Sequence, residues 1–535
     1  MTGPKDWWTE AVFYEIYVRS FQDSNGDGIG DLNGITERLD YLVDLGIDAV
    51  WLTPFYPSPQ VDFGYDISDY CDVDPQFGTL ADFDRLVNEA HRRNVKIVTD
   101  LVLNHTSDQH EWFRMSRSAR ASPKRDWYIW RDPARDGGPP NNWSSAFGPT
   151  AWTLDPATGQ YYYHFFYPEQ PDLNWRNPEV EAVMFDMVRF WMDRGVDGFR
   201  LDAIQTLYED ESLPDNPVRD ELRSGSRDER VQDWHFTTHQ PETFSLLERL
   251  RAFVDARDPS VVLIGESADC NSYDELMPYY GCDGPGVQLP FNFLFTLVRG
   301  LNASAFRDQV ADVERLLQGE RATTYVLSNH DLPRAVDRYA NAKRQRDRIA
   351  KLLAMLLLTL RGAPFIYYGE EIGMPTTEPR RLEDVRDAVG RQYWPVNKGR
   401  DGERTPMQWD AGPHAGFSTG VPWLPIPSSS GRRNVGRQSA EAGSLLNFYR
   451  ALLRLRRGSQ ALVHGDYEAV GDDPSVFAYL RRAEDQEVLV ALNMSGKPAA
   501  FSTELALRRL LGNVHDAAAD GCLAPYEATL WEVIR

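Results

Sequence analysis

The sequence predicts an α/β fold: a closed (β/α)8 barrel with a small domain inserted after the third strand and an antiparallel β-domain at the C-terminal end. Short apolar runs alternate with helix-like segments along most of the 535 residues. One aromatic-rich stretch interrupts that rhythm, and near the end of the chain the pattern turns to strand-type alternation. We therefore expect a barrel of residues 1–106 and 175–458, an inserted subdomain of residues 107–174 and a C-terminal β-sandwich domain of residues 459–535.

Eight apolar runs of strand length are the expected barrel strands. Helical periodicity is clear between several of them, in residues 34–45, 80–93, 179–194 and 446–457. Because the strands of such a barrel are parallel, their carboxyl ends all lie at one rim, where barrel enzymes keep their chemistry. The expected strands are Ala11–Val18, Ile47–Leu52, Val95–Leu103, Val196–Asp202, Val261–Glu266, Val287–Leu294, Thr323–Asn329 and Pro364–Glu370.

Two long segments depart from the strand-helix rhythm. The first, residues 107–174, is rich in Trp, Tyr, Pro, Gly and Asn and is too long for a simple loop, which indicates an inserted subdomain. The second, residues 205–233, is strongly polar and follows the fourth strand. We expect it to lie over the same rim as a lid or as a wall of the acceptor site. In the C-terminal region, Ser475–Leu480 and Glu487–Leu492 show the alternation of antiparallel strands.

Composition and charge exclude several classes of partner. The net charge of −23 argues against nucleic acids and anionic membranes, which attract basic surfaces. The 15 Trp are suggestive of sugar binding, although large cores also use this residue. No signal peptide and no apolar run long enough to span a membrane is visible, so we expect a cytoplasmic monomer or homodimer. The four cysteines are expected to be reduced, with a Cys270–Cys282 disulfide as the alternative.

A short polar loop after the first strand has the composition of a calcium site. Oxygen-bearing side chains alternate along residues 23–31, and glycines supply the tight bend. The loop lacks the distal Glu of an EF-hand, and an Asx/Gly-rich turn without an ion is the alternative. We expect a structural Ca²⁺, with Mg²⁺ also compatible, bound by the side chains of Asp23, Asn25, Asp27 and Asp31 and the carbonyl of Ile29.

Charged residues gather at the carboxyl ends of several predicted strands. Asp202, Glu266 and Asp331 should converge on one rim, and three carboxylates so placed would repel unless one of them holds a proton. A protonated carboxyl beside an ionised one is what glycoside hydrolysis requires, as acid and nucleophile. Arg200 shares a strand face with Asp202 and can keep it ionised. The alternative for that pair is a structural salt bridge, and a lone histidine such as His105 or His330 is more often a core residue.

These motifs resemble the α-amylase family of glycoside hydrolases, in particular its oligo-1,6-glucosidase/α-glucosidase subgroup. The resemblance runs through nearly the whole chain. It is carried by Asp100–His105, Gly198–Asp202, Gly265–Ser267, Ser328–Asp331 and Gly362–Glu371, with Gln170–Asn174 resembling the marker of the subgroup.

The resemblance implies a retaining mechanism through a covalent glucosyl-enzyme. Asp202 would be the nucleophile, Glu266 the acid/base and Asp331 a transition-state stabiliser that binds sugar hydroxyls. Asp62 and Arg404 would pair and block the far end of the pocket, so that the enzyme removes one glucose at a time from the non-reducing end. The residues implied around that glucose are Asp62, Tyr65, His105, Phe147, Phe166, Arg200, Ala203, His330 and Arg404.

Two residues refine the expected substrate. Enzymes similar to this one tend to have Val after the nucleophile when they cleave α-1,6 linkages, whereas this chain has Ala203. Phe63 stands where many oligo-1,6-glucosidases have Asn. We therefore expect hydrolysis of maltose and short α-1,4-linked oligosaccharides, with sucrose or other α-glucosides as further substrates. Transfer of glucose to a sugar or alcohol acceptor would use the same intermediate.

Three alternatives share the predicted fold. An oligo-1,6-glucosidase would differ only in the glycosidic linkage that it cleaves. A trehalose synthase would keep the cleaved glucose enclosed and re-form an α,α-1,1 bond, and residues 103–110 resemble that group too. A non-catalytic member, like the heavy chains of amino-acid transporters, would need a membrane span and typically lacks the catalytic carboxylates. The sequence has no such span and keeps all three carboxylates.

Overall fold

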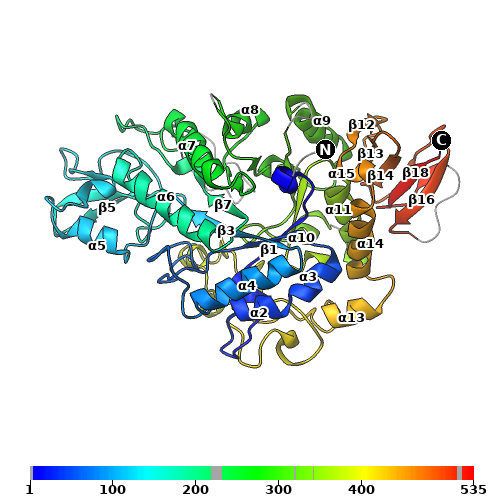
Figure 1. Cartoon of the computed structure of the whole chain (residues 1–535), viewed down its shortest axis with the longest axis horizontal. Coiled ribbons are helices and arrows are strands. Elements are labelled where there is room, and N and C mark those ends of the chain that lie inside the picture. The colour runs from blue at the N-terminus through cyan, green and yellow to red at the C-terminus, as the bar shows by residue number, and fades with distance from the viewer. Residues whose placement is uncertain are drawn as a thin grey trace.

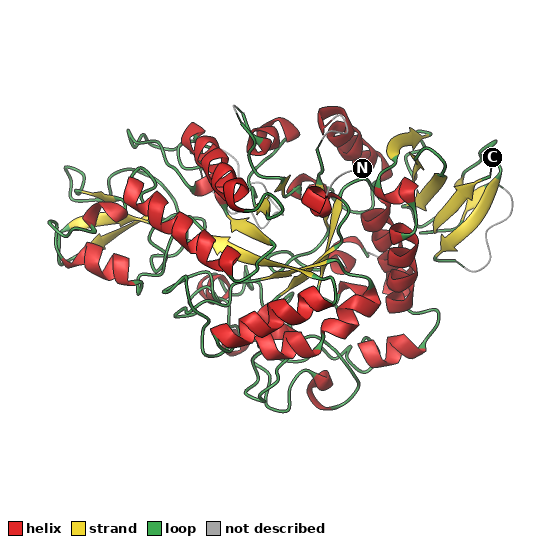
Figure 2. Ribbon diagram, viewed as in Figure 1, coloured by secondary structure: helices red, strands yellow, loops and turns green. Residues whose placement is uncertain are grey.

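A computed structural model describes residues 4–218, 232–282, 284–317, 321–340, 343–514 and 521–534. Eight parallel strands form its central sheet in the order β10-β11-β1-β2-β3-β7-β8-β9, and helices surround them (Figures 1 and 2). The barrel is nearly closed. At the seam between β9 and β10, Thr324 Oγ1 accepts a hydrogen bond from the backbone N of Asn292 at 2.8 Å and donates one to the carbonyl of Pro290 at 3.3 Å.

The barrel strands confirm the predicted order. All but β11, which begins one residue earlier, lie inside the predicted apolar runs. They are β1 Phe13–Ile16, β2 Ala49–Leu52, β3 Lys96–Val102, β7 Gly198–Asp202, β8 Val262–Gly265, β9 Leu289–Pro290, β10 Thr324–Val326 and β11 Ala363–Tyr367.

The interior of the barrel has an apolar lower layer and a charged upper layer. Near the amino ends of the strands, Phe13 stacks on Phe365 with ring centroids 4.5 Å apart, and Trp51 packs beside them. Two residues further along β1, on the same face, stands the buried carboxyl of Glu15. Asp100 of β3 lies in register with Arg200 of β7. The strand ends therefore place charged groups above a packed floor.

One predicted helix is divided in two. Residues 34–45 fall into α2 Leu32–Glu37 and α3 Leu39–Leu45, because Arg38 leaves helical geometry with φ −100° and ψ 5°. Its guanidinium donates to Gln22 Oε1 at 2.8 Å and lies over the Trp409 ring at 4.2 Å. These tertiary contacts coincide with the break. The longer helices around the barrel are α4 Leu80–Arg92, α6 Pro178–Asp193, α7 Pro241–Arg257, α9 Ala303–Leu317, α11 Arg346–Thr359 and α14 Leu445–Arg457.

The insertion after β3 contains helix α5 (Glu111–Ser118) and a three-stranded antiparallel sheet of order β4-β6-β5. It lies at one end of the molecule (Figure 1). The backbone N of Leu173 donates to the carbonyl of Asn104 at 2.9 Å and ties the end of the insertion to the rim of the barrel. The strands are β4 Trp130–Arg131, β5 Trp152–Asp155 and β6 Gln160–Tyr163.

The C-terminal region lies at the opposite end of the molecule and forms an antiparallel sheet of order β12-β13-β14-β18-β16 (Figure 1). A two-stranded sheet of β15 and β17 packs against it through Ala499 and Leu523. All four cysteines are free, so the alternative Cys270–Cys282 disulfide is not formed. The strands are β12 Asp466–Val470, β13 Val476–Arg482, β14 Glu487–Asn493, β15 Ala499–Ala500, β16 Leu507–Gly512, β17 Cys522–Leu523 and β18 Ala528–Val533.

Among the residues described, no helix combines the length and apolar character that crossing a bilayer would require.

Candidate active site

A single buried guanidinium joins the carboxylates of three neighbouring barrel strands. Arg200 Nη1 donates to Asp202 Oδ1 at 2.7 Å and to Asp100 Oδ1 at 2.6 Å, and its Nη2 donates to Glu266 Oε2. Arg200 is only 1% exposed. Charge-assisted hydrogen bonds of this kind are short and directional, so they fix the carboxyl groups in place.

This arrangement sets the spacing of Asp202 and Glu266. Each carboxyl group bonds to a different terminal nitrogen of Arg200, so the two groups are held close together. Retaining glycosidases need a separation of about 5–5.5 Å, whereas inverting enzymes leave about 6.5–9.5 Å for a water molecule. A shared guanidinium favours the shorter spacing.

Burial and like charges change the acidity of this cluster. Burial, followed by the charges of Glu266 and Asp100, raises the pKa of Asp202 well above its ordinary value, although Arg200 opposes the shift. Burial also raises the pKa of Asp100 to about 6. Because Asp202 and Asp100 share one cation, the protonation of one depends on that of the other. These two carboxyl groups can therefore hold a proton near neutral pH, whereas the sequence placed the shared proton among Asp202, Glu266 and Asp331, and Asp331 does not bond to this guanidinium.

Asp331 is in the opposite electrostatic situation. Burial alone would raise its pKa, but His330, Arg400 and Arg404 outweigh burial and hold the pKa of Asp331 well below its usual range. Arg404 Nη2 donates to Asp331 Oδ1 at 2.8 Å, and Arg400 Nη1 donates to the same oxygen at 3.1 Å. Asp331 is thus a stable anion beside a cluster that can carry a proton.

The two predicted histidines are buried hydrogen-bonding groups. Burial lowers the pKa of His105 and of His330 to about 3, so both rings are neutral at physiological pH. His330 Nδ1 lies 2.6 Å from Glu15 Oε1, and its Nε2 lies 2.8 Å from the hydroxyl of Tyr65. His105 Nε2 lies 3.0 Å from Gln170 Nε2. Both rings can therefore orient polar groups without adding charge.

These groups surround a cavity of about 100 Å³ at the carboxyl ends of the strands. Arg200, His330 and Arg404 are not among its lining residues and act on it through the side chains they contact. Of the predicted residues, Asp62, Tyr65, His105, Phe147, Phe166, Asp202, Ala203, Glu266 and Asp331 line the cavity, together with Gln170, Gln205, Ala268 and Arg400, which were not predicted.

The predicted pair between Asp62 and Arg404 is wrong, because Asp62 pairs with Arg400 instead. Arg400 Nη2 donates to Asp62 Oδ1 at 2.6 Å and to Asp387 Oδ1 at 3.0 Å. Arg404 lies behind Asp331, where its Nε donates to the carbonyl of His330 at 2.8 Å. The buried carboxyl of Asp387 fixes Arg400 in the pocket wall beside Asp62, whereas Arg404 does not line the pocket and is held behind Asp331.

Ala203 shapes the turn that follows Asp202. It has the left-handed backbone angles φ 43° and ψ 45°, which are uncommon for a residue with a side chain. In this conformation its backbone N donates to Glu266 Oε2 at 3.1 Å. The strained turn therefore connects the end of β7 directly to the carboxyl group that follows β8.

The predicted lid is described only at its two ends, because residues 219–231 lie outside the described part of the chain. Val218 and Gln232 form an isolated antiparallel bridge. The side chain of Asn142, in the insertion, donates to the carbonyl of Asn216 at 2.9 Å. Both flanks of this segment therefore lie beside the insertion.

Comparison with known proteins identifies the family to which this chain belongs. The family model described as "Alpha amylase, catalytic domain" matches residues 15–465. The chain belongs to the α-amylase family. It is 44% identical to a probable alpha-glucosidase of Rhizobium meliloti over 95% of this chain and 92% of that protein. It is 39% identical to an oligo-1,6-glucosidase of Heyndrickxia coagulans over 98% of this chain and 99% of that protein.

The fold is likewise similar to that of a solved alpha-glucosyl transfer enzyme. The crystal structure of the alpha-glucosyl transfer enzyme XgtA superposes with a TM-score of 0.93 at 43% sequence identity, covering 99% of both chains. The likeness extends from the barrel through the insertion and the C-terminal sheet. This chain is accordingly an enzyme, a glycoside hydrolase of the α-amylase family.

The predicted calcium loop of this α-amylase family member is held by its own hydrogen bonds. Asp23 accepts from the backbone N of Asn25, Gly26 and Gly28 and from Ser418 Oγ at 2.6–2.9 Å, which occupies its acceptor positions. Asp31 accepts from the backbone N of Gly34 at 2.7 Å and caps α2. Within the described ranges, no group of three His, Cys, Asp or Glu side chains is arranged to hold a metal. The ion stays a prediction.

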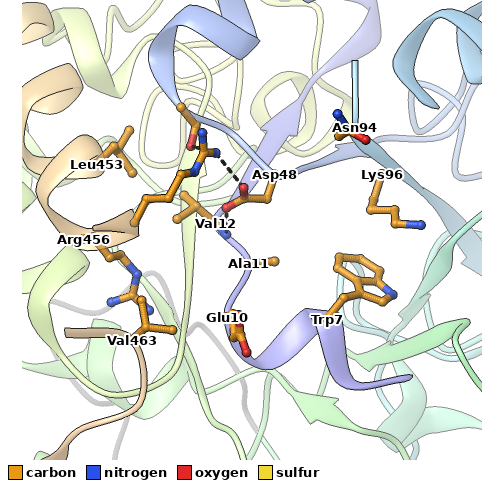
Figure 3. A pocket seen from close by; sticks show the side chains of 12 residues that line it. Trp7, Glu10, Ala11, Val12, Asp48, Asn94, Lys96, Leu453, Arg456 and Val463 are labelled. Carbon is orange, nitrogen blue, oxygen red and sulfur yellow. Dashed lines mark hydrogen bonds and ion pairs between the residues drawn. The ribbon is translucent and has the colours of Figure 1, made fainter. Parts of the chain in front are cut away.

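A second cavity, of about 260 Å³, lies at the amino ends of the strands, on the other side of the barrel from the carboxylates (Figure 3). Asp48 accepts there from the backbone N of Val12 at 3.0 Å and from Arg457 at 2.7 Å. Lys96, on the same wall, is paired with Asp197 at 2.8 Å. These charges are already matched within the protein, and the carboxylate cluster around Arg200 lies at the other rim, as expected for a barrel enzyme.

Proposed function

We propose that the protein is a retaining, exo-acting α-glucosidase. The observation that carries this proposal is the single guanidinium of Arg200 joining Asp202 to Glu266 beside a pocket of about 100 Å³, whose far end the ion pair of Asp62 and Arg400 would close. A closed pocket accepts one terminal sugar and excludes the interior of a polysaccharide. The relatives named α-glucosidase and oligo-1,6-glucosidase support α-glucosides as the substrate class.

The first half of the reaction forms a glucosyl-enzyme. Asp202 attacks the anomeric carbon, while Glu266 donates its proton to the glycosidic oxygen, so that the C1–O bond breaks as the C1–Asp202 bond forms. In the second half, Glu266 as carboxylate removes a proton from water or from another hydroxyl. The oxygen of that molecule attacks C1 and releases Asp202. Two inversions give net retention of the α-configuration.

The surrounding side chains would bind the glucose ring. The anionic Asp331, held by two arginines, can accept hydrogen bonds from sugar hydroxyls. The pair Asp62–Arg400 can read the terminal hydroxyls from the far wall. Tyr65 presents an aromatic side chain to the cavity and is positioned by its contact with His330. Neutral His105 supplies a further hydrogen-bonding group.

The linkage preference that we propose is α-1,4, and it rests on Ala203. This residue lines the pocket directly after Asp202, and its small side chain leaves room that a β-branched residue would occupy. Phe63 gives less support, because it is not among the lining residues and packs against Trp423 with ring centroids 5.2 Å apart. Maltose and short maltooligosaccharides are therefore the proposed substrates, with sucrose as a further one.

Chromatography of the products from maltose, isomaltose and sucrose tests this function, with Asp202→Asn as the control. The proposal expects glucose from maltose, faster than from isomaltose, and none from the control. A preference for isomaltose would make the enzyme an oligo-1,6-glucosidase. Trehalose as the main product would make it a trehalose synthase. Absence of turnover on all three sugars would overturn the proposed substrate class.

A further inference from the structure

The carboxyl group of Glu15 is buried inside the barrel and has no part in the reaction described above. It stands on β1, and its side chain is only 1% exposed. Its Oε1 lies 2.6 Å from His330 Nδ1 and accepts a hydrogen bond from the backbone N of His330 at 3.2 Å. One oxygen atom of Glu15 therefore contacts two nitrogen atoms of the same residue.

The far side of the His330 ring meets two more polar groups. Its Nε2 lies 2.8 Å from the hydroxyl of Tyr65 and 3.2 Å from Asp331 Oδ2. The Tyr65 hydroxyl donates to Asp100 Oδ2 at 3.1 Å. A chain of contacts thus runs from Glu15 through the imidazole to Asp331 and Asp100. Because a hydroxyl and a neutral imidazole each carry one proton, the direction of one hydrogen bond in this chain fixes the direction of the others.

One arrangement of protons has Glu15 ionised. Glu15 then accepts from Nδ1–H of a neutral His330, which leaves Nε2 without a proton. The lone pair of Nε2 faces the anionic Asp331 at 3.2 Å, and Tyr65 must donate to Nε2 in place of Asp100. This arrangement buries two carboxylates on either side of one uncharged ring, which costs free energy.

The other arrangement has Glu15 protonated. Its hydroxyl donates to Nδ1, and the same oxygen accepts from the backbone N of His330. Nε2–H then donates toward Asp331 and Tyr65, and the Tyr65 hydroxyl donates to Asp100, so that every contact in the chain is a hydrogen bond. Burial lowers the pKa of His330 to about 3, so this proton belongs to the oxygen of Glu15 and not to the ring.

We propose that Glu15 is a positioning residue that, as a neutral acid, holds His330 in the Nε2–H tautomer. The inference rests on the proposed function, because the Nε2 proton orients Asp331, which would bind hydroxyls of the glucose. Asp331 then has a donor at each oxygen, with Nε2–H at Oδ2 and Arg404 Nη2 at Oδ1. Loss of the proton from Glu15 would turn the ring to the other tautomer and remove the donor at Oδ2.

The surroundings of Glu15 favour its neutral form. Burial, followed by the charge of Asp331, raises the pKa of Glu15 well above its ordinary value. The backbone N of His330 and the charge of Arg200 oppose this shift, whereas Asp100 adds to it. Activity that needs neutral Glu15 is therefore lost as the pH rises through this raised pKa. The titratable groups around the carboxyl are His330 and Asp331 after β10, Arg200 of β7, Asp100 of β3 and Tyr367 of β11, which is in register with Glu15.

Glu15→Gln tests the proposal, because an amide is neutral at every pH and its nitrogen can donate to Nδ1. The measurement is kcat/KM for α-glucosyl fluoride across the pH range, since departure of fluoride needs no proton from Glu266. In the wild type, kcat/KM should fall as the pH rises through the pKa of Glu15. In Glu15→Gln this alkaline limb should move to higher pH.

Two further variants separate positioning from packing. At the pH optimum of the wild type, Glu15→Gln should keep kcat/KM within about threefold, whereas Glu15→Met, which has no donor, should lower it about tenfold or more. Glu10→Gln is the matched control, since Glu10 is exposed in the segment just before β1. Its pH profile should equal that of the wild type. Melting temperatures of all variants report whether each one folds.

Nitrogen-15 NMR of protein labelled at its ten histidines reads the tautomer directly, and His330→Gln identifies the signal of His330. We expect the proton on Nε2 in the wild type and in Glu15→Gln. A proton on Nδ1 in the wild type would overturn the inference. An unchanged alkaline limb in Glu15→Gln, or equal kcat/KM in the Gln and Met variants, would overturn it as well. Absence of fluoride release by the wild type would instead overturn the proposed function.

Discussion

Arg400 Nη2 lies 2.6 Å from Asp62 Oδ1, and this ion pair joins two side chains, 338 positions apart in the sequence, that both line the pocket at the carboxyl ends of the strands. Both side chains are largely buried, and Asp331 and Asp387 contact the same guanidinium at 3.1 and 3.0 Å. A cation shared by three carboxylates cannot be removed without leaving buried anions unpaired. The more informative substitutions are therefore those that keep the size and shape of the side chain.

Asp62→Asn should reduce kcat/KM for maltose by about 10–100-fold, because it removes a charge-assisted interaction of about 1.5–3 kcal/mol while keeping the volume of the side chain. Asp69→Asn is the matched control, since Asp69 is exposed in the same loop and its Oδ1 accepts from a backbone N that Asn can also satisfy. Steady-state kinetics on maltose give kcat/KM for both variants and for the wild type. Equal loss in the two variants would show that Asp62 does not contact the sugar.

The acidity of Asp202 predicts the acidic limb of the pH profile. Asp202 must be ionised to attack, and its pKa is raised, first by burial and then by Glu266 and Asp100. Activity should therefore fall on acidification at a pH above the ordinary aspartate value of about 3.9. In Glu266→Gln one of the raising charges is absent, so the acidic limb should move to lower pH.

This shift can be measured as kcat/KM for α-glucosyl fluoride, whose departure needs no proton from Glu266. Wild type and Glu266→Gln are compared over the acidic range at constant ionic strength. An unchanged acidic limb in the variant would mean that Glu266 does not influence the ionisation of Asp202.

The predicted calcium ion is tested at Asp27, whose Oδ1 accepts from the backbone N of Ile29 at 2.8 Å. Asn can keep that bond but loses the charge that a cation would need. With calcium bound, EDTA should lower the melting temperature of the wild type, and Asp27→Asn should abolish the difference. Activity at mild temperature should change less than the melting temperature. Identical melting of the wild type with calcium and with EDTA would leave the loop as a turn held by its own hydrogen bonds.

Arg481 connects the C-terminal sheet to the barrel. Its Nη1 donates to the carbonyl of Thr359, the last residue of α11, at 2.7 Å, and its Nη2 donates to the carbonyl of Gly465 at 2.8 Å. Arg481→Met should lower the free energy of unfolding by about 2–4 kcal/mol, because it leaves buried carbonyls without a donor. Arg508→Met in the same region removes an exposed ion pair and should change stability by less than about 1 kcal/mol. Denaturant unfolding measures both, and similar losses would contradict the assigned role.

Much of the fold and of the site could be predicted because both follow from strand periodicity. Side chains two apart on a strand share a face, so Arg200 and Asp202 had to emerge together at the end of β7. Parallel strands bring their carboxyl ends to one rim, which placed Glu266 beside them. No tertiary information was needed for these residues.

The remaining features depend on contacts that a local pattern does not contain. Arg400 reaches Asp62 from a distant loop, and nothing in its sequence neighbourhood distinguishes it from Arg404 as the partner. Gln170 belonged to a recognised marker, yet its contact with His105 at 3.0 Å appears only in the folded chain. The break at Arg38 coincides with the packing of its guanidinium on Trp409, which helical periodicity cannot reveal.

Trapping the glucosyl-enzyme tests the central claim most directly. The enzyme is incubated with 5-fluoro-α-D-glucosyl fluoride, digested, and analysed by tandem mass spectrometry. The account predicts one 5-fluoroglucosyl group per chain, attached to the peptide that contains Asp202, and none in Asp202→Asn. A label on Glu266 or Asp331, or turnover of the reagent to the β-anomer without any label, would contradict it.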